Sequence, residues 1–133
     1  IDSPVGTAAW IIEKFFSWSD LKKGNINKIY SKDLLLTNIM IYILTKSFNT
    51  SSWVYFGRRE EGGRNFPIKF NKIKVPTAIA EFPKEMSEWP PKSYVNRIFN
   101  VVRWTKMPRG GHFAALEEPE LLIRDIKSFF KKI

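Results

Sequence analysis

Residues 107–115 read MPRGGHFAA, and they hold His112, the only histidine among the 133 residues of the chain. The segment follows a β-branched run that ends near Trp104 and precedes an acid-rich helix start, EEPE, at 117–120. Two glycines before the histidine permit backbone conformations that larger residues disfavour, and loops between strands and helices often carry functional side chains. We therefore expect His112 to be presented at a strand-to-helix loop rather than packed in a core.

Two apolar runs upstream of this loop predict β-strands. Residues 75–80, VPTAIA, have the length and composition of a buried strand, with Pro76 among its first residues. A short helix is expected over 92–97, and residues 98–104, which contain Val101 and Val102, predict the second strand. The order strand, helix, strand, helix is typical of a parallel pair in an α/β fold.

The last helix is predicted from Pro119 onward. Its start is rich in glutamates, Glu117, Glu118 and Glu120, which complement the positive end of the helix dipole. Lysines complement its other end: Lys127, Lys131 and Lys132. We expect its apolar face to pack on the sheet through Leu122, Ile126, Phe129 and Phe130.

Helices are also predicted in the first half of the chain. Asp2 or Ser3 can cap a helix that runs through Trp18, with Pro4 in its first turn and an apolar stripe of Val5, Ala8, Ala9, Ile12 and Phe15 or Phe16. Residues 20–30 form a polar connection. A second helix, capped by Ser31 and reaching about Lys46, is apolar on nearly all sides and is expected to be buried. After a polar break at 48–52, a short helix from Ser51 or Ser52 carries Tyr55 and ends at Gly62-Gly63.

Composition excludes several classes of function. Without cysteine and with a single histidine, the chain offers no disulfide, thiolate site or cysteine nucleophile, and we expect neither a metal nor a cofactor. The formal charge is +9, but the basic residues are scattered and no base-stacking motif accompanies them, which favours a solvated surface over nucleic-acid binding. The longest apolar stretch, 34–44, is too short to cross a bilayer.

Four blocks of sequence carry a family resemblance. They are DSPVGTAAWIIEKF at 2–15, WSD at 18–20, LLTNIMIY at 35–42 and RGGHFAALEEPELL at 109–122. In this order they resemble the C-terminal part of the microsomal-type epoxide hydrolases, which are α/β-hydrolases. The resemblance implies that residues 1–64 form lid helices, and that 65–133 form the last two parallel strands and the final helix of the α/β-hydrolase core.

The resemblance also implies a mechanism. In that family an aspartate attacks an epoxide carbon, tyrosines protonate the epoxide oxygen, and a histidine with an acidic partner activates the water that hydrolyses the ester. His112 matches the histidine of the family's Gly-Gly-His-Phe motif, and Glu85, in FPKE at 82–85, matches the acid. Tyr55 matches one lid tyrosine, although WVY at 53–55 stands where the family has Arg-Phe-Tyr.

General chemistry is consistent with these roles. A neutral imidazole can take a proton from water, and a carboxylate on its other nitrogen fixes the tautomer and stabilises the resulting cation. Glu85 and His112 each follow a predicted strand, so both are expected at the carboxyl edge of the sheet, with Glu81 and Glu88 as rival acids. The five tryptophans are expected in the core or in a pocket wall.

The nucleophile is the missing part. The chain has no Gly-x-Ser-x-Gly elbow, and the family's aspartate, oxyanion loop and second lid tyrosine would lie upstream of Ile1. We therefore expect a fragment that is inactive alone, requires the N-terminal half of the enzyme, and acts on an epoxide and water; membrane attachment and localisation stay open. The alternatives are haloalkane dehalogenase or esterase chemistry on the same fold, or a non-catalytic basic binding module.

Overall fold

The computed structural model describes residues 3–62 and 71–131. Helices α1 (Pro4–Ser17), α2 (Lys32–Leu44) and α3 (Phe48–Glu60) come first, with two 3₁₀ turns, η1 (Lys22–Gly24) and η2 (Ile26–Lys28), between α1 and α2. Strands β1 (Ile73–Glu81) and β2 (Phe99–Lys106) flank α4 (Lys92–Ile98), and α5 (Ala114–Glu117) and α6 (Pro119–Phe130) end the described chain. The expectations for Asp2, Gly63, residues 65–70 and Lys132 lie outside the described residues.

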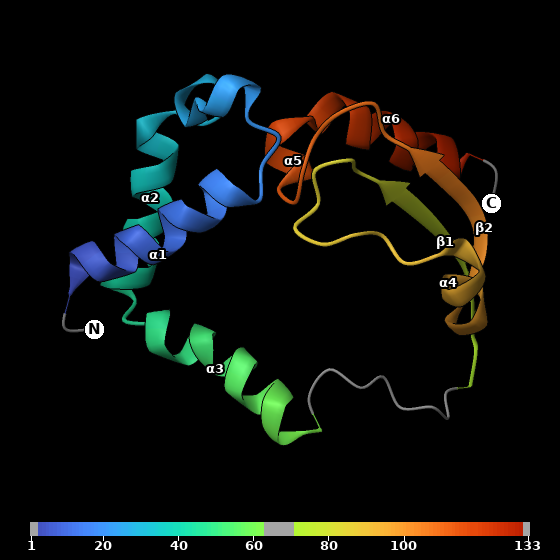
Figure 1. The fold of residues 1–133 in the computed structure, drawn as a ribbon, viewed down its shortest axis with the longest axis horizontal. Helices are drawn as coiled ribbons and strands as arrows, with labels where there is room; N and C mark the ends of the chain where they lie inside the picture. Colours follow the sequence, from blue (N-terminus) through green and yellow to red (C-terminus); the bar gives the residue numbers. More distant parts are fainter. Residues whose placement is uncertain (1–2, 63–70, 132–133) are drawn as a thin grey trace.

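The two strands form the parallel pair that the sequence predicts. Their register runs from Ile73 opposite Phe99 to Glu81 opposite Lys106. β1 begins two residues earlier than predicted, so Pro76 lies inside the strand, and the register shifts between Ile73 and Pro76. Proline lacks the amide that a ladder needs, which accounts for an irregularity at this point. In Figure 1 both strand arrows point toward α5 and the loops beside it.

Helix α6 lies along the sheet, but a polar contact anchors it. Asp125 is its one buried residue, and its Oδ1 accepts hydrogen bonds from Arg103 Nε at 3.0 Å and Thr105 Oγ1 at 2.8 Å, both on β2. The expected apolar packing is wrong in part, because Ile126 and Phe130 are exposed. A pair of strands is too narrow to cover the whole apolar face of this helix.

The buried core of the helical part lies between α1 and α2 and consists of Ile11, Phe15, Tyr30, Leu35 and Ile39. Ser3 and Ser31 cap the two helices as predicted, with the amides of Gly6 and Leu34 donating to their hydroxyls. The predicted stripe of α1 is shifted, because the buried residues are Thr7, Ile11 and Phe15, whereas Val5 and Phe16 are exposed. Tyr30, in the predicted polar connection, is only 1% exposed.

Two further expectations about the helices need correction. Helix α2 is not buried on all sides, because Leu35 and Ile39 alone are buried while Leu36, Met40, Ile41 and Leu44 are exposed. Helix α3 begins at Phe48, so residues 48–52 are helical rather than a break. The hydroxyls of Ser51 and Ser52 donate to the carbonyls of Phe48 and Asn49, so these polar side chains are satisfied within the helix.

Strand β1 is also less buried than expected, since Ile73 and Val75 are exposed and its later residues are half-buried. The apolar composition of 75–80 predicts neighbours on both faces, and the described residues supply too few of them. Across residues 3–62 and 71–131, none of the helices combines the length and apolar character that a membrane crossing requires.

Candidate active site

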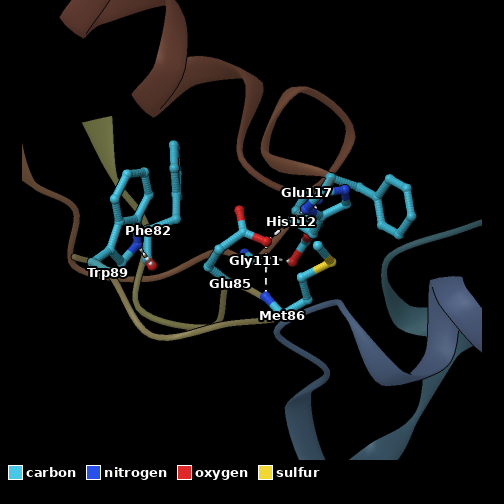
Figure 2. Close-up of polar contacts among 8 residues, drawn as sticks. Phe82, Glu85, Met86, Trp89, Gly111, His112 and Glu117 are labelled. Atoms are coloured by element: carbon cyan, nitrogen blue, oxygen red, sulfur yellow. Dashed lines mark hydrogen bonds and ion pairs between the residues drawn. The ribbon is translucent and has the colours of Figure 1, made fainter. Parts of the chain in front are cut away.

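The loops that follow the two strands bring Glu85 and His112 together (Figure 2). A single parallel bridge pairs Lys84 with Gly111 beyond the strand ends, and the Lys84 amide donates to the Gly110 carbonyl at 3.1 Å. This extension of the pairing places the His112 ring beside the glutamate, with Nδ1 2.5 Å from Glu85 Oε1. Two residues 27 positions apart in the sequence thus share one contact.

The Glu85 carboxylate is oriented by the backbone amide of the next residue as well as by the imidazole. Its Oε1 accepts a hydrogen bond from the Met86 amide at 2.8 Å. The side chains of His112 and Glu85 are 35% and 24% exposed, so the pair lies at a surface that solvent reaches. Of the rival acids, Glu81 accepts from the Trp104 indole at 2.5 Å and Glu88 is exposed. Among the described carboxylates, Glu85 is the partner of His112.

Four consecutive amides fix the backbone of the histidine loop. The Gly110 amide donates to Asp20 Oδ2 at 3.0 Å, and the His112 amide donates to the Trp18 carbonyl at 2.9 Å. The amides on either side of His112, those of Gly111 and Phe113, donate to the two carboxylate oxygens of Glu117, each at 2.9 Å. Every amide from 110 to 113 therefore has an acceptor, and two of the four acceptors lie just after α1.

Neighbouring atoms approach the two glycines of this loop so closely that a side chain would not fit at either position. Gly110 has a φ of +103°, which a side chain would strain, and a Cβ there would lie 2.7 Å from Phe82 Cδ1. A Cβ on Gly111 would lie 2.6 Å from the Trp18 carbonyl oxygen and 2.8 Å from that of Lys84. Gly111 is thus enclosed by backbone from two other segments.

Aromatic rings connect the histidine loop to α1. The Trp18 indole meets the His112 imidazole edge to face, with ring centroids 5.1 Å apart. Phe113 stacks on Phe15 at 4.4 Å. Lys14 lies over the Trp18 ring at 5.1 Å from its centroid. The ring environment of His112 is therefore supplied partly by the end of the first helix.

An open groove of about 260 Å³ lies between the three long helices, and Tyr55 and Phe113 both line it. Tyr55 is 60% exposed on α3. No hydrogen bond joins Tyr55 to His112 in the described part of the chain. The structure therefore brings Glu85 to His112, and these two residues are not among those that line the groove with Tyr55. Trp10 and Trp18 form part of the groove wall, as expected, whereas Trp53 is exposed. No group of three His, Asp or Glu residues that could bind a metal occurs within 3–62 and 71–131.

Sequence reasoning missed two residues of this region. Glu117 is expected to complement a helix dipole, yet its carboxylate accepts from three backbone amides, including that of Asp20 at 2.7 Å. The Tyr30 hydroxyl lies 2.7 Å from Ser19 Oγ. Burial and the nearby charge of Glu117 raise the pKa of Tyr30 to about 12, so its phenol stays neutral at ordinary pH. The acidic run at 117–120 marks Glu117 in the sequence, but such a run is equally consistent with a helix-dipole role and with acceptance of backbone hydrogen bonds.

No protein-family model matches the chain. Among curated proteins, it is similar to "Epoxide hydrolase 1" of Oryctolagus cuniculus, with 44% identity over 96% of this chain and 29% of that protein. It is 39% identical to "Juvenile hormone epoxide hydrolase 2" of Ctenocephalides felis, over 98% of this chain and 29% of that protein. The chain therefore spans 29% of the length of these curated relatives.

Solved structures show the same similarity. Juvenile hormone epoxide hydrolase from the silkworm Bombyx mori matches 98% of this chain with a TM-score of 0.86 and 28% identity, over 32% of its own chain. The Aspergillus niger epoxide hydrolase matches 99% of this chain with a TM-score of 0.70 and 27% identity, over 31% of its own chain. The arrangement of helices and parallel strands described above is thus the C-terminal part of an α/β-hydrolase fold.

Proposed function

Because this chain matches the C-terminal part of epoxide hydrolases in both sequence and fold, we propose that it supplies the water-activating half of an epoxide hydrolase active site. The observation that carries the proposal is the contact between His112 Nδ1 and Glu85 Oε1. Histidine and carboxylate in this arrangement can act as a general base and its orienting partner. The expected product is a vicinal diol.

The contact with Glu85 makes the two imidazole nitrogens of His112 chemically different. The nitrogen that faces its carboxylate is Nδ1, so the proton of the neutral ring resides there and Nε2 is left as the base. When Nε2 takes a proton from water, the negative charge of Glu85 stabilises the imidazolium.

The proposed reaction has two steps. In the first, an aspartate carboxylate from the remainder of the enzyme forms an ester bond to an epoxide carbon, the ring C–O bond breaks, and Tyr55 protonates the ring oxygen. In the second, His112 deprotonates a water molecule that attacks the ester carbonyl, and the acyl–oxygen bond breaks. The departing oxygen takes the proton from the imidazolium, and the proton released as the aspartate ionises again restores Tyr55.

The groove suits an apolar epoxide. Its wall includes the aromatic side chains of Trp10, Phe15, Tyr42, Phe48 and Phe113. In this proposal residues 1–64 contribute the lid that forms the groove, and 65–133 contribute the core that holds Glu85 and His112. Tyr55, on the wall of the groove, would reach the epoxide oxygen from the side of α3.

We expect the 133-residue chain alone to form no diol from an aryl epoxide such as styrene oxide, because the first step needs a nucleophile that we assign to another part of the enzyme. A chimaeric enzyme, in which this chain replaces the matching segment of the Oryctolagus cuniculus protein, is expected to form diol. Chromatographic measurement of diol with both proteins tests this. Turnover by the chain alone, or a folded chimaeric enzyme without turnover, would refute the proposal.

Exchanging Glu85 for glutamine should lower diol formation by the chimaeric enzyme about 100-fold, the lower end of what a general base contributes, because the amide keeps the shape but cannot stabilise the imidazolium by charge. The steady-state kcat is the quantity to compare. Glu88→Gln is the matched control, since this neighbouring glutamate is exposed and His112 meets Glu85 instead. Equal kcat values for the two variants would remove Glu85 from the mechanism.

A further inference from the structure

The Glu117 carboxylate accepts hydrogen bonds from the backbone amides on both sides of His112. Its Oε2 accepts from the Gly111 amide at 2.9 Å, and its Oε1 accepts from the Phe113 amide at 2.9 Å. His112 is the residue between those two amides. Figure 2 labels Glu117 beside Gly111 and His112. Glu117 thus holds the amides on both sides of His112, while the His112 amide itself donates to the Trp18 carbonyl.

The same carboxylate reaches a distant segment. Its Oε2 also accepts from the Asp20 amide at 2.7 Å, and this contact joins residues 97 positions apart in the chain. The Asp20 side chain makes a second contact between these segments, because its Oδ2 accepts from the Gly110 amide at 3.0 Å. The segment held in this way carries Trp18, whose indole lies edge to face against the His112 ring. Glu117 therefore fixes both the histidine and the ring that borders it.

Three amide donors require a carboxylate. An ionised carboxylate offers acceptor sites on both oxygens, whereas the amide of glutamine has one acceptor oxygen and one nitrogen that only donates. Glutamine at 117 would therefore leave an amide facing an NH₂ group, on one side of His112 or on the other. Hydrogen bonds to a charged acceptor are also stronger than those to a neutral one.

We propose that Glu117 is a positioning residue for the general base, in that its three amide contacts hold the His112 backbone and the 18–20 segment in the geometry that water activation needs. This inference rests on the proposed function. A displacement of about 1 Å at a reacting group can cost about 100-fold in rate. Because His112 acts in ester hydrolysis and not in ester formation, a displaced His112 slows only the second step.

Glu117→Gln in the chimaeric enzyme separates the two steps. With styrene oxide in excess and rapid acid quenching, mass spectrometry gives the rates at which the ester adduct forms and disappears. We expect hydrolysis to fall 10-fold to 100-fold, adduct formation to stay within 2-fold, and the ester to accumulate. Both rates are counted per enzyme molecule that reacts, so partial unfolding does not alter them. If Glu117→Gln yields no folded protein, Glu117→Asp, which keeps the charge on a shorter side chain, receives the same measurement.

Glu118→Gln is the matched control. Glu118 is the adjacent carboxylate, but its Oε1 pairs with Nε of the exposed Arg109 at 2.6 Å and not with the amides beside His112, and ion pairs with exposed partners contribute little. We expect it to leave both steps unchanged. Unchanged hydrolysis in Glu117→Gln, or an equal fall in both steps, would overturn the positioning role. If His112→Ala itself fails to accumulate ester, the proposed function fails instead, so the two failures are distinguishable.

Discussion

Replacement of His112 by alanine will convert the chimaeric enzyme into a protein that reacts once with an epoxide and then stops. In the proposed mechanism ester formation does not need the imidazole, whereas hydrolysis loses its general base, a type of group that contributes about 10² to 10⁴ in rate. We expect steady-state diol formation to fall about 1,000-fold. Intact-protein mass spectrometry after incubation with styrene oxide should show one adduct with the mass of the epoxide.

Two comparisons make this result specific. The unmodified chimaeric enzyme under the same conditions should show far less adduct, because its ester is hydrolysed as it forms. The alanine variant incubated with the diol should show none, because a diol has no strained ring for a carboxylate to open. An alanine variant that carries no adduct, or that turns over at the unmodified rate, would exclude His112 as the base.

Substitution of Gly111 by alanine should destabilise the protein by about 3 kcal/mol, at the upper end of what overpacking costs. A Cβ at this position would lie 2.6 Å from the Trp18 carbonyl oxygen, 2.8 Å from that of Lys84 and 3.0 Å from the Asp20 amide nitrogen. All three are backbone atoms, so no side chain can rotate away to make room. The denaturant concentration at the midpoint of unfolding of the chimaeric enzyme should fall, and diol formation with it.

Gly57→Ala is the corresponding control. Gly57 lies in α3, and a Cβ there would meet no atom within 4 Å beyond its chain neighbours and the nearby backbone of its own helix. Alanine favours a helix over glycine by about 1 kcal/mol, so this variant should unfold at the same denaturant concentration or at a higher one. If Gly111→Ala unfolds at the same midpoint as Gly57→Ala, the enclosure of Gly111 by backbone is not a constraint on the fold.

Much of the local structure could be predicted because its signals are local. Ser3 and Ser31 cap their helices, and the strand, helix, strand order of 73–106 gives a parallel pair. The contact between Glu85 and His112 also agrees with the sequence, since parallel strands end at the same edge of a sheet. The chemical roles of these two residues, and that of Tyr55, stay predictions.

The parts that could not be predicted depend on contacts between distant segments. Periodicity identifies α2 as apolar on all sides, but it does not say that Leu36 and Leu44 would be exposed while Leu35 is buried. The carboxylate of Glu117 has several plausible partners in sequence, and only the approach of residues 18–20 selects among them. Likewise, Asp125 becomes the buried residue of α6 because Arg103 and Thr105 meet it from β2.

The hydrogen bond from the His112 amide to the Trp18 carbonyl, which joins the histidine loop to the end of α1, has a practical consequence. At position 18 it uses the carbonyl oxygen, an atom that every amino acid possesses, while the indole at that position lines the groove. The side chain at position 18 can therefore change while the carbonyl that accepts from the His112 amide remains. A library randomised at Trp18 would leave the carbonyl anchor in place while it varies both the groove wall and the ring that borders His112, so in the proposed enzyme selectivity and the surroundings of the base would be tuned at one position.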